Sequence, residues 1–226
     1  MTIFIRKARS DDVPRLVELN RAAYPDLVEE GVVFDEAQIR SHLGVFPRGQ
    51  LVAEIDGRIV GAIATLVLPR AIDPLGAHTW MGVTDGGTFA RHDDAGDTLY
   101  LADVYVDAAA WGRGVGRALY RALFSLCREL GLRRVVAGGR LYDYDAHAAT
   151  LSPDEYVARV QRGELRDRVL VSQLRAGFTV RGLLADYLHD WRSRHWATLL
   201  VWENSETPTV AARFACERAA PGEPAV

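Results

Sequence analysis

The part of the sequence best suited to chemistry is a short run of glycines that opens a helix-forming stretch. Residues 111–116 read Trp-Gly-Arg-Gly-Val-Gly. Glycines at a helix start expose successive backbone amides, and the positive end of the helix dipole adds to them, so a diphosphate is the natural ligand. Arginines at positions 113, 117 and 121 are spaced by four, which places their guanidinium groups on one side of the same helix start.

Other nucleotide-binding motifs fit this loop less well. A dinucleotide fold needs G-x-G-x-x-G, but Arg117 stands where the third glycine would be, and no G-K-[ST] makes a P-loop. A structural interpretation stays open, in which the glycines only make a tight turn and the arginines form a solvated stripe.

Asp103 is the candidate general base, and Asp97 lies on the approach to it. Asp103 falls in a strand expected over residues 98–106, where alternation puts Asp103 and Tyr105 on one face and Val104 and Val106 on the other. If the first face lines a cleft, Asp103 could deprotonate an amine directly or through water. The alternative is a structural carboxylate held by hydrogen bonds.

The spacing of the histidines, cysteines and serines predicts neither a metal site nor a catalytic nucleophile. There is no H-x-x-H, H-E-x-x-H or G-x-S-x-G motif, and Cys127 and Cys216 form neither a ligand-spaced pair nor a disulfide framework. We therefore expect no metal.

Composition limits the class of protein. The chain has 226 residues, 49% of them hydrophobic, with a net charge of −3, which is consistent with a single globular domain. This charge gives no case for a nucleic-acid or membrane partner, and no window resembles a signal peptide or a membrane span. We expect a cytoplasmic protein and allow for a homodimer.

The elements that must position these residues follow from hydrophobic periodicity and from turn and capping signals. Strands are expected over 2–8, 50–55, 58–68, 98–106, 133–138, 178–184 and 196–202, and helices over 10–24, 35–43, 114–130, 153–162 and 166–176. This order predicts an α+β fold with a mixed sheet. Residues 1–204 form the domain, with insertions near 69–97 and 142–163, and 205–226 form a flexible tail.

On these residues the sequence resembles the GNAT superfamily of N-acetyltransferases. The family's motif is [RQ]-x-x-G-x-[GA] at the start of the helix after the fourth strand, and residues 111–116 match it except that Trp111 replaces Arg or Gln. The resemblance covers roughly residues 3–203. It includes Leu174-Arg175-Ala176-Gly177-Phe178, which looks like the family's last junction between helix and strand.

The resemblance implies acetyl-CoA as co-substrate and direct attack of a neutral amine on the thioester. The diphosphate would bind the loop, and the pantetheine arm would pair with the fourth strand. The residues carried over as coenzyme-binding are Val104, Tyr105, Val106, Trp111, Gly112, Arg113, Gly114, Val115, Gly116, Arg117 and Gln173.

The general acid is the part of this pattern that the sequence lacks. The family often has tyrosine four residues before the Gly-Phe pair, where this chain has Gln173. Ser172 is a weak substitute. Tyr142 and Tyr144 are the catalytic candidates, or else an aromatic wall of the acceptor pocket, and would point the same way if their segment is extended.

The two insertions predict a small-molecule amine as acceptor. If residues 69–97 and 142–163 fold over one cleft mouth, the pocket is deep and partly closed, whereas a protein substrate needs an open groove. The alternatives are a catalytically silent acyl-CoA-binding or regulatory module, and a protein or peptide N-acetyltransferase.

Overall fold

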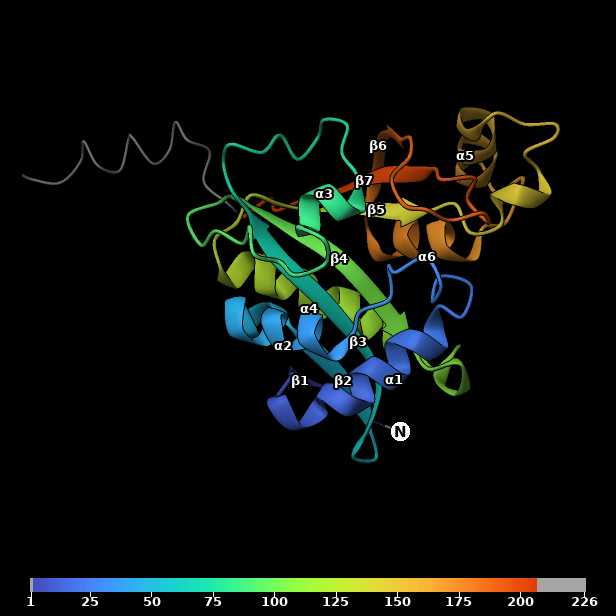
Figure 1. Cartoon of the computed structure of the whole chain (residues 1–226). Helices are drawn as coiled ribbons and strands as arrows, with labels where there is room; N and C mark the ends of the chain where they lie inside the picture. The colour runs from blue at the N-terminus through green and yellow to red at the C-terminus, as the bar shows by residue number, and fades with distance from the viewer. Residues whose placement is uncertain (1, 207–226) are drawn as a thin grey trace, which may run out of the picture.

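A computed structural model describes residues 2–206, in which a mixed seven-stranded sheet has the order β1-β2-β3-β4-β5-β7-β6 (Figure 1). The strands are β1 (Phe4–Lys7), β2 (Leu51–Ile55), β3 (Arg58–Leu68), β4 (Thr98–Val106), β5 (Arg134–Arg140), β6 (Thr179–Leu184) and β7 (Ala197–Glu203). The α-helices are α1 (Val13–Ala23), α2 (Glu36–Val45), α3 (Trp80–Thr84), α4 (Val115–Glu129), α5 (Pro153–Gln161) and α6 (Arg168–Ala176). β4 and β5 are parallel, and every other neighbouring pair is antiparallel.

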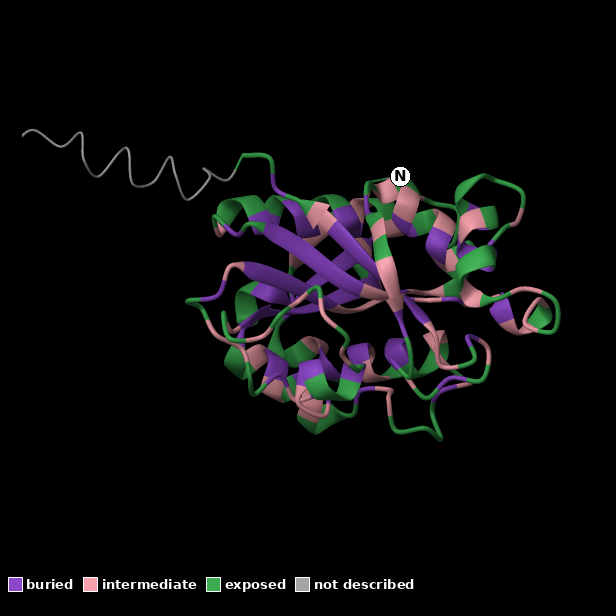
Figure 2. Cartoon of the chain, turned by 90° about the horizontal axis from the view of Figure 1, so that it is seen from above, coloured by how far each residue is buried: buried purple, intermediate pink, exposed green. Residues whose placement is uncertain are grey.

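Helices cover both faces of the sheet, as the view from above shows (Figure 2). One hydrophobic cluster joins α4, α5 and α6 to one face, and the second joins α1, α2 and α3 to the other. We call these the α4 face and the α1 face. Among the described residues, no helix is both long and apolar enough to cross a bilayer.

Turns and helix caps lie where short sequence patterns predicted them. The Asp56-Gly57 pair has φ values of 51° and 75° and joins β2 to β3 in a tight hairpin turn. Ser152 caps α5 by accepting a hydrogen bond from the backbone N–H of Glu155, as its capping-box sequence predicts. The α+β fold expected from the sequence is confirmed, with boundaries shifted by one to three residues and the expected start of the first helix forming a 3₁₀ turn, Ser10–Asp12.

The sheet opens between its two parallel strands. β4 and β5 are in register only from Thr98 to Leu101 and from Arg134 to Ala137, although both strands continue beyond these points. Opposite β3, Leu101 pairs with Thr65 and Asp103 with Ala64, so Ala102 is a bulge. A bulge bends its strand and increases its twist, which accounts for the separation of β4 from β5 at this place.

The two long segments expected to cover one cleft mouth instead pack on opposite faces. The 69–97 segment places Trp80 and Phe89 in the hydrophobic cluster of the α1 face. The 142–163 segment places Tyr144 and Tyr156 in the cluster of the α4 face. Each segment buries its own aromatic side chains against the nearest helices, so the expectation of a shared lid is wrong. Nearly all of the expected tail, residues 207–226, lies outside the described residues.

Candidate active site

The glycine-rich loop leads directly into the N-terminus of α4. Gly112 and Gly114 have φ values of 73° and 85°, a left-handed conformation that favours glycine, and Gly114 is the residue preceding the first turn of the helix. The space where a Cβ would stand at Gly112 or Gly116 has no atom within 4 Å. Backbone amides and open space at a 15-residue helix start suit a bulky anion.

The side chain of Trp111 is exposed and is not buried within the glycine-rich loop. Its side chain is 58% exposed, and its indole N–H donates to the carbonyl of Val106 at 3.0 Å. The guanidinium of Arg168 lies 6.0 Å from the ring centroid. Trp111 therefore ties the loop back to the end of β4.

A cavity of about 260 Å³ lies between α4 and α6, beside this loop. Its lining combines four arginines with other polar and apolar side chains: Arg117, Tyr120, Arg166, Arg168, Val171, Ser172, Arg175 and Ala176. Within residues 2–206, none of the four arginines forms an ion pair with a carboxylate. Guanidinium groups without a carboxylate partner give this cavity a positive charge that suits an anion, and we call it the arginine cavity.

Asp103 lies at the opening of the sheet, on the α1 face, where two side chains donate to its carboxylate. One carboxylate oxygen accepts from the amide of Asn20 at 2.6 Å, and the other accepts from the hydroxyl of Tyr24 at 2.6 Å. Burial raises the pKa of Asp103 from an ordinary 3.8 to about 6, although these hydrogen bonds and the charge of Arg140 lower it. A carboxylate with a pKa near neutrality is suited to accept a proton.

Arg140, at the end of β5, organises the side of the opening that faces Asp103. It holds both carboxylate oxygens of Asp190 at 2.8 Å, and one nitrogen reaches Asp26 at 2.9 Å. Arg192 also donates to Asp26, at 3.0 Å. Burial acts to raise the pKa of Asp190, but the paired Arg140 outweighs it, so the pKa of Asp190 is lowered and its charge is maintained. This network ties the segment after α1 to β5 and to the β6–β7 connection.

The strand residues carried over from the resemblance divide between the two faces. Val104 and Val106 pack against the cluster of the α4 face, whereas Tyr105 is buried in that of the α1 face, as alternation predicts. The carbonyl of Val104 accepts a hydrogen bond from Tyr24. Val115 is 1% exposed, so only its backbone is available to a ligand.

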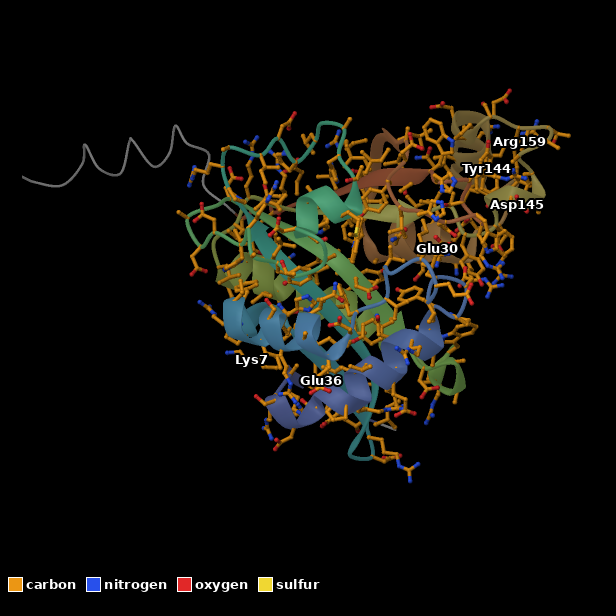
Figure 3. All side chains as sticks on the ribbon, in the orientation of Figure 1. Lys7, Glu30, Glu36, Tyr144, Asp145 and Arg159 are labelled. Atoms are coloured by element: carbon orange, nitrogen blue, oxygen red, sulfur yellow. The ribbon has the colours of Figure 1, made fainter. Side chains whose placement is uncertain are left out.

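The tyrosines expected to act together are separated in the structure. The segment turns at residues 144–146 instead of remaining extended, so Tyr142 and Tyr144 do not share a direction. The Tyr144 hydroxyl donates to the carbonyl of Leu151, and its ring packs on Tyr156. Figure 3 shows Tyr144 beside α5, away from β4. We therefore withdraw Tyr144 as a catalytic candidate.

Tyr142 remains close to the opening. Its ring lies within 5.4 Å of the guanidinium carbons of Arg140, Arg168 and Arg192, measured to the ring centroid. An aromatic ring surrounded by arginines fits an amphipathic wall, the second of the two roles considered for it, and the catalytic role of Tyr142 stays a prediction.

Sequence reasoning missed several residues that the fold brings to this site. Asn20 and Tyr24 come from α1 and its C-terminal end, Arg140 comes from β5, and none of them belongs to a local motif. Arg140 ends a strand whose residues 135–139 are all apolar or glycine, and a charge at such a point was the one available signal.

Comparison with known proteins agrees with this geometry. A family model described as the acetyltransferase (GNAT) family matches residues 13–150. The Bacillus subtilis protein named uncharacterized N-acetyltransferase YkwB is 32% identical over 200 residues, which are 88% of each chain.

Solved structures share the fold to different degrees. The GphF GNAT-like decarboxylase, in complex with isobutyryl-CoA, has a TM-score of 0.75 and 25% identity, over 88% of this chain and 98% of that one. A GNAT superfamily phosphinothricin acetyltransferase from Sinorhizobium meliloti, in complex with acetyl-CoA, has a TM-score of 0.55 and 18% identity, over 91% and 90%.

Proposed function

Because the chain belongs to the GNAT family of acetyltransferases, we propose that it transfers an acetyl group from acetyl-CoA to the nitrogen of a small amine. The observation that carries the proposal is the opening between β4 and β5, which has Asp103 on one side and the glycine loop and arginine cavity beside it.

The residues present fit a coenzyme A molecule. The loop amides at 112–116 would hold its diphosphate, and the arginine cavity would take the remaining phosphate charge. The backbone of Val104 to Val106, which no neighbouring strand pairs on the β5 side, would hold the pantetheine arm. When bound, the coenzyme supplies an acyl group activated as a thioester.

Asp103 is proposed to take the proton from the attacking amine. Its raised pKa of about 6 leaves it ionised at neutral pH, yet basic enough to accept a proton as the amine nitrogen becomes positively charged. Tyr24 and Asn20 fix its orientation. Tyr142 and the network around Arg140 would form the wall that faces the acceptor.

The acceptor is proposed to be a small molecule because the base is recessed. Tyr24 and the Arg140 network link three separate segments around Asp103, so an extended protein chain has no straight path to it. This argument replaces the shared lid expected from the sequence.

The test is release of free thiol from acetyl-CoA with a broad panel of small amines, peptide N-termini and a folded protein. We expect the highest kcat/KM with a small amine. A higher kcat/KM for the folded protein would contradict the acceptor class, and coenzyme binding without thiol release from any amine would indicate a silent binding module.

The role of the arginine cavity is tested separately by calorimetry with acetyl-CoA. Replacing Arg166 and Arg175 together by glutamine should weaken binding at least tenfold, because two charge-assisted contacts are lost. Arg159→Gln on α5 (Figure 3) is the matched control, since it removes an exposed arginine elsewhere and should leave affinity unchanged. Equal affinities would exclude the cavity from the coenzyme site.

A second candidate is decarboxylation of an acyl-CoA that carries a carboxylate on the carbon next to the thioester carbonyl, where loss of carbon dioxide leaves an enolate that takes up a proton. It is favoured by the TM-score of 0.75 with a GNAT-like decarboxylase, against 0.55 with the solved acetyltransferase. Arginines near Tyr142 could hold such a carboxylate. Release of carbon dioxide from malonyl-CoA in the absence of an amine would establish this activity.

A further inference from the structure

Tyr120 is buried between α4 and α6, in the wall of the arginine cavity. It lies in the second turn of α4, is 5% exposed, and its ring meets that of Phe178 edge-on at 5.8 Å. Its hydroxyl lies beside the side-chain amide of Gln173 on α6, which acts to lower the pKa of Tyr120. A phenol is therefore held at the seam between the two helices that underlie the opening of the sheet.

Gln173 lies beside this phenol and has a hydrogen-bond acceptor that no described group uses. It is 4% exposed, and its Oε1 atom has no hydrogen-bond partner among the described residues. That atom faces β5, since a Cβ added to Gly139 would come within 2.6 Å of it. A buried amide oxygen without a partner is unfavourable in a folded protein, and this one lies where β5 has separated from β4.

Tyr120 and Asp103 lie on opposite faces of the sheet but within electrostatic reach of each other. Burial raises the pKa of Tyr120 well above its ordinary 10.0, the neighbouring Gln173 amide acts to lower it, and the charge of Asp103 acts to raise it. The pKa of Tyr24, raised first by burial and by Asp103, is also raised by Tyr120. The opening thus has a carboxylate on its α1 face and a protonated phenol on its α4 face.

The other hydroxyl groups near the opening are less suitable. Ser172 is exposed on the outer wall of the cavity. The Tyr24 hydroxyl already donates to Asp103 and Val104. Tyr142 is surrounded by arginines on the acceptor side.

We propose that Tyr120 is the general acid of the acetyl transfer and that Gln173 is the residue that positions it. The inference rests on the proposed function. As the bond between the amine nitrogen and the acetyl carbon forms, the bond from that carbon to sulfur breaks and its electron pair remains on sulfur. Tyr120 donates its hydroxyl proton to that sulfur, giving the free thiol, and regains a proton from water, while Asp103 takes the proton from nitrogen.

This assignment gives the chain an acid although its α6 helix has glutamine at the position where related enzymes often carry tyrosine. The phenol comes from the neighbouring helix α4 instead, and the glutamine amide lies beside it.

The first test is Tyr120→Phe, which keeps the ring against Phe178 and removes only the hydroxyl. We expect kcat to fall about 10- to 100-fold, with KM for acetyl-CoA within about twofold of wild type, because the proton is needed only in the transition state. Tyr144→Phe, which also removes one buried tyrosine hydroxyl but lies beside α5 and away from the cavity, is the control and should keep kcat. A Tyr120→Phe kcat within about threefold of wild type would refute the assignment.

A binding measurement separates a contact to sulfur from a structural role. Calorimetry should show wild-type protein binding CoA more tightly than desulfo-CoA, which lacks the sulfur, and Tyr120→Phe should reduce this ratio towards one. An unchanged ratio, or an equal loss of affinity for both ligands, would contradict contact between Tyr120 and the sulfur.

Gln173 is tested by rescue. Gln173→Leu should lower kcat, whereas Gln173→Glu at low pH, where the acid side chain is protonated, should recover most of the kcat that wild type has at that same pH. Retention of wild-type kcat in Gln173→Leu would remove its positioning role. Failure of wild-type protein to bind acetyl-CoA would overturn the proposed function itself, whereas wild-type turnover with an unaffected Tyr120→Phe would overturn only this inference.

Discussion

Replacing Asp103 by asparagine should remove the proposed base while leaving the structure around it intact. In the wild type the two carboxylate oxygens accept from Asn20 and from Tyr24. The amide oxygen of Asn20 is fixed by the backbone N–H of Phe34, so Asn20 must continue to donate. An asparagine at 103 can accept from it with its oxygen and donate its amide to the Tyr24 hydroxyl, which then donates to the carbonyl of Val104.

The stability effect follows from the sign of the pKa change. The pKa of Asp103 is raised from 3.8 to about 6. Between these values the native state binds more protons than the unfolded state, so the free energy of unfolding falls as pH rises through this window. At low pH the protonation of Asp103 contributes about 3 kcal/mol to the free energy of unfolding. About 1.4 kcal/mol of this contribution is lost between pH 5 and pH 8.

Urea unfolding of wild type and Asp103→Asn at pH 5 and pH 8 measures this difference directly. All other ionisable groups are shared, so their contributions cancel when the two proteins are compared at each pH. We expect the variant to gain about 1.4 kcal/mol relative to wild type on going from pH 5 to pH 8. A difference between the proteins that does not change with pH would refute the assigned pKa.

The same variant tests catalysis. With a weakly basic aromatic amine, which is neutral throughout the range, wild-type kcat should rise with pH through about 6 as Asp103 ionises. Asp103→Asn should lose this rise and lower kcat roughly 10²-fold, with acetyl-CoA affinity near that of wild type. Full activity of the variant at every pH would reject Asp103 as the base, even if the stability result agreed.

Two glycine substitutions test the positions of the loop and of β5. Calorimetry should show no acetyl-CoA binding by Gly114→Asp, because this variant puts a negative charge at the proposed diphosphate site. Gly163→Asp controls for backbone strain, since Gly163 has a similar φ of 77° after α5, and this variant should bind acetyl-CoA normally. Gly138→Ala should destabilise the protein by more than about 2 kcal/mol in urea unfolding, because its Cβ would come within 2.1 Å of the buried Tyr187 ring. Its control is Gly182→Ala, whose Cβ meets no atom within 4 Å and which should cost less than about 1 kcal/mol. Normal acetyl-CoA binding by Gly114→Asp would remove the loop from the coenzyme site, and equal stability of the two alanine variants would contradict the packing of β5 against Tyr187.

The sequence was sufficient for the features that depend on near neighbours in the chain. The spacing of apolar residues on one side of 115–129 predicted α4, and the Asp56-Gly57 pair predicted the hairpin. The glycine loop could be placed at a helix start because strand, loop and helix follow one another without a break. Helical periodicity and turn conformation are properties of a few consecutive residues, so one sequence records them.

The tertiary structure decided which side chains meet at the opening. The bulge at Ala102 aims Asp103 at the α1 face, and its donors Asn20 and Tyr24 lie 83 and 79 residues away in the chain. The turn at Tyr144 sends that residue away from the opening into the α4-face cluster, which an extended segment would not have done. A bulge and contacts between distant segments depend on how whole elements pack, and no local pattern in the sequence encodes that packing.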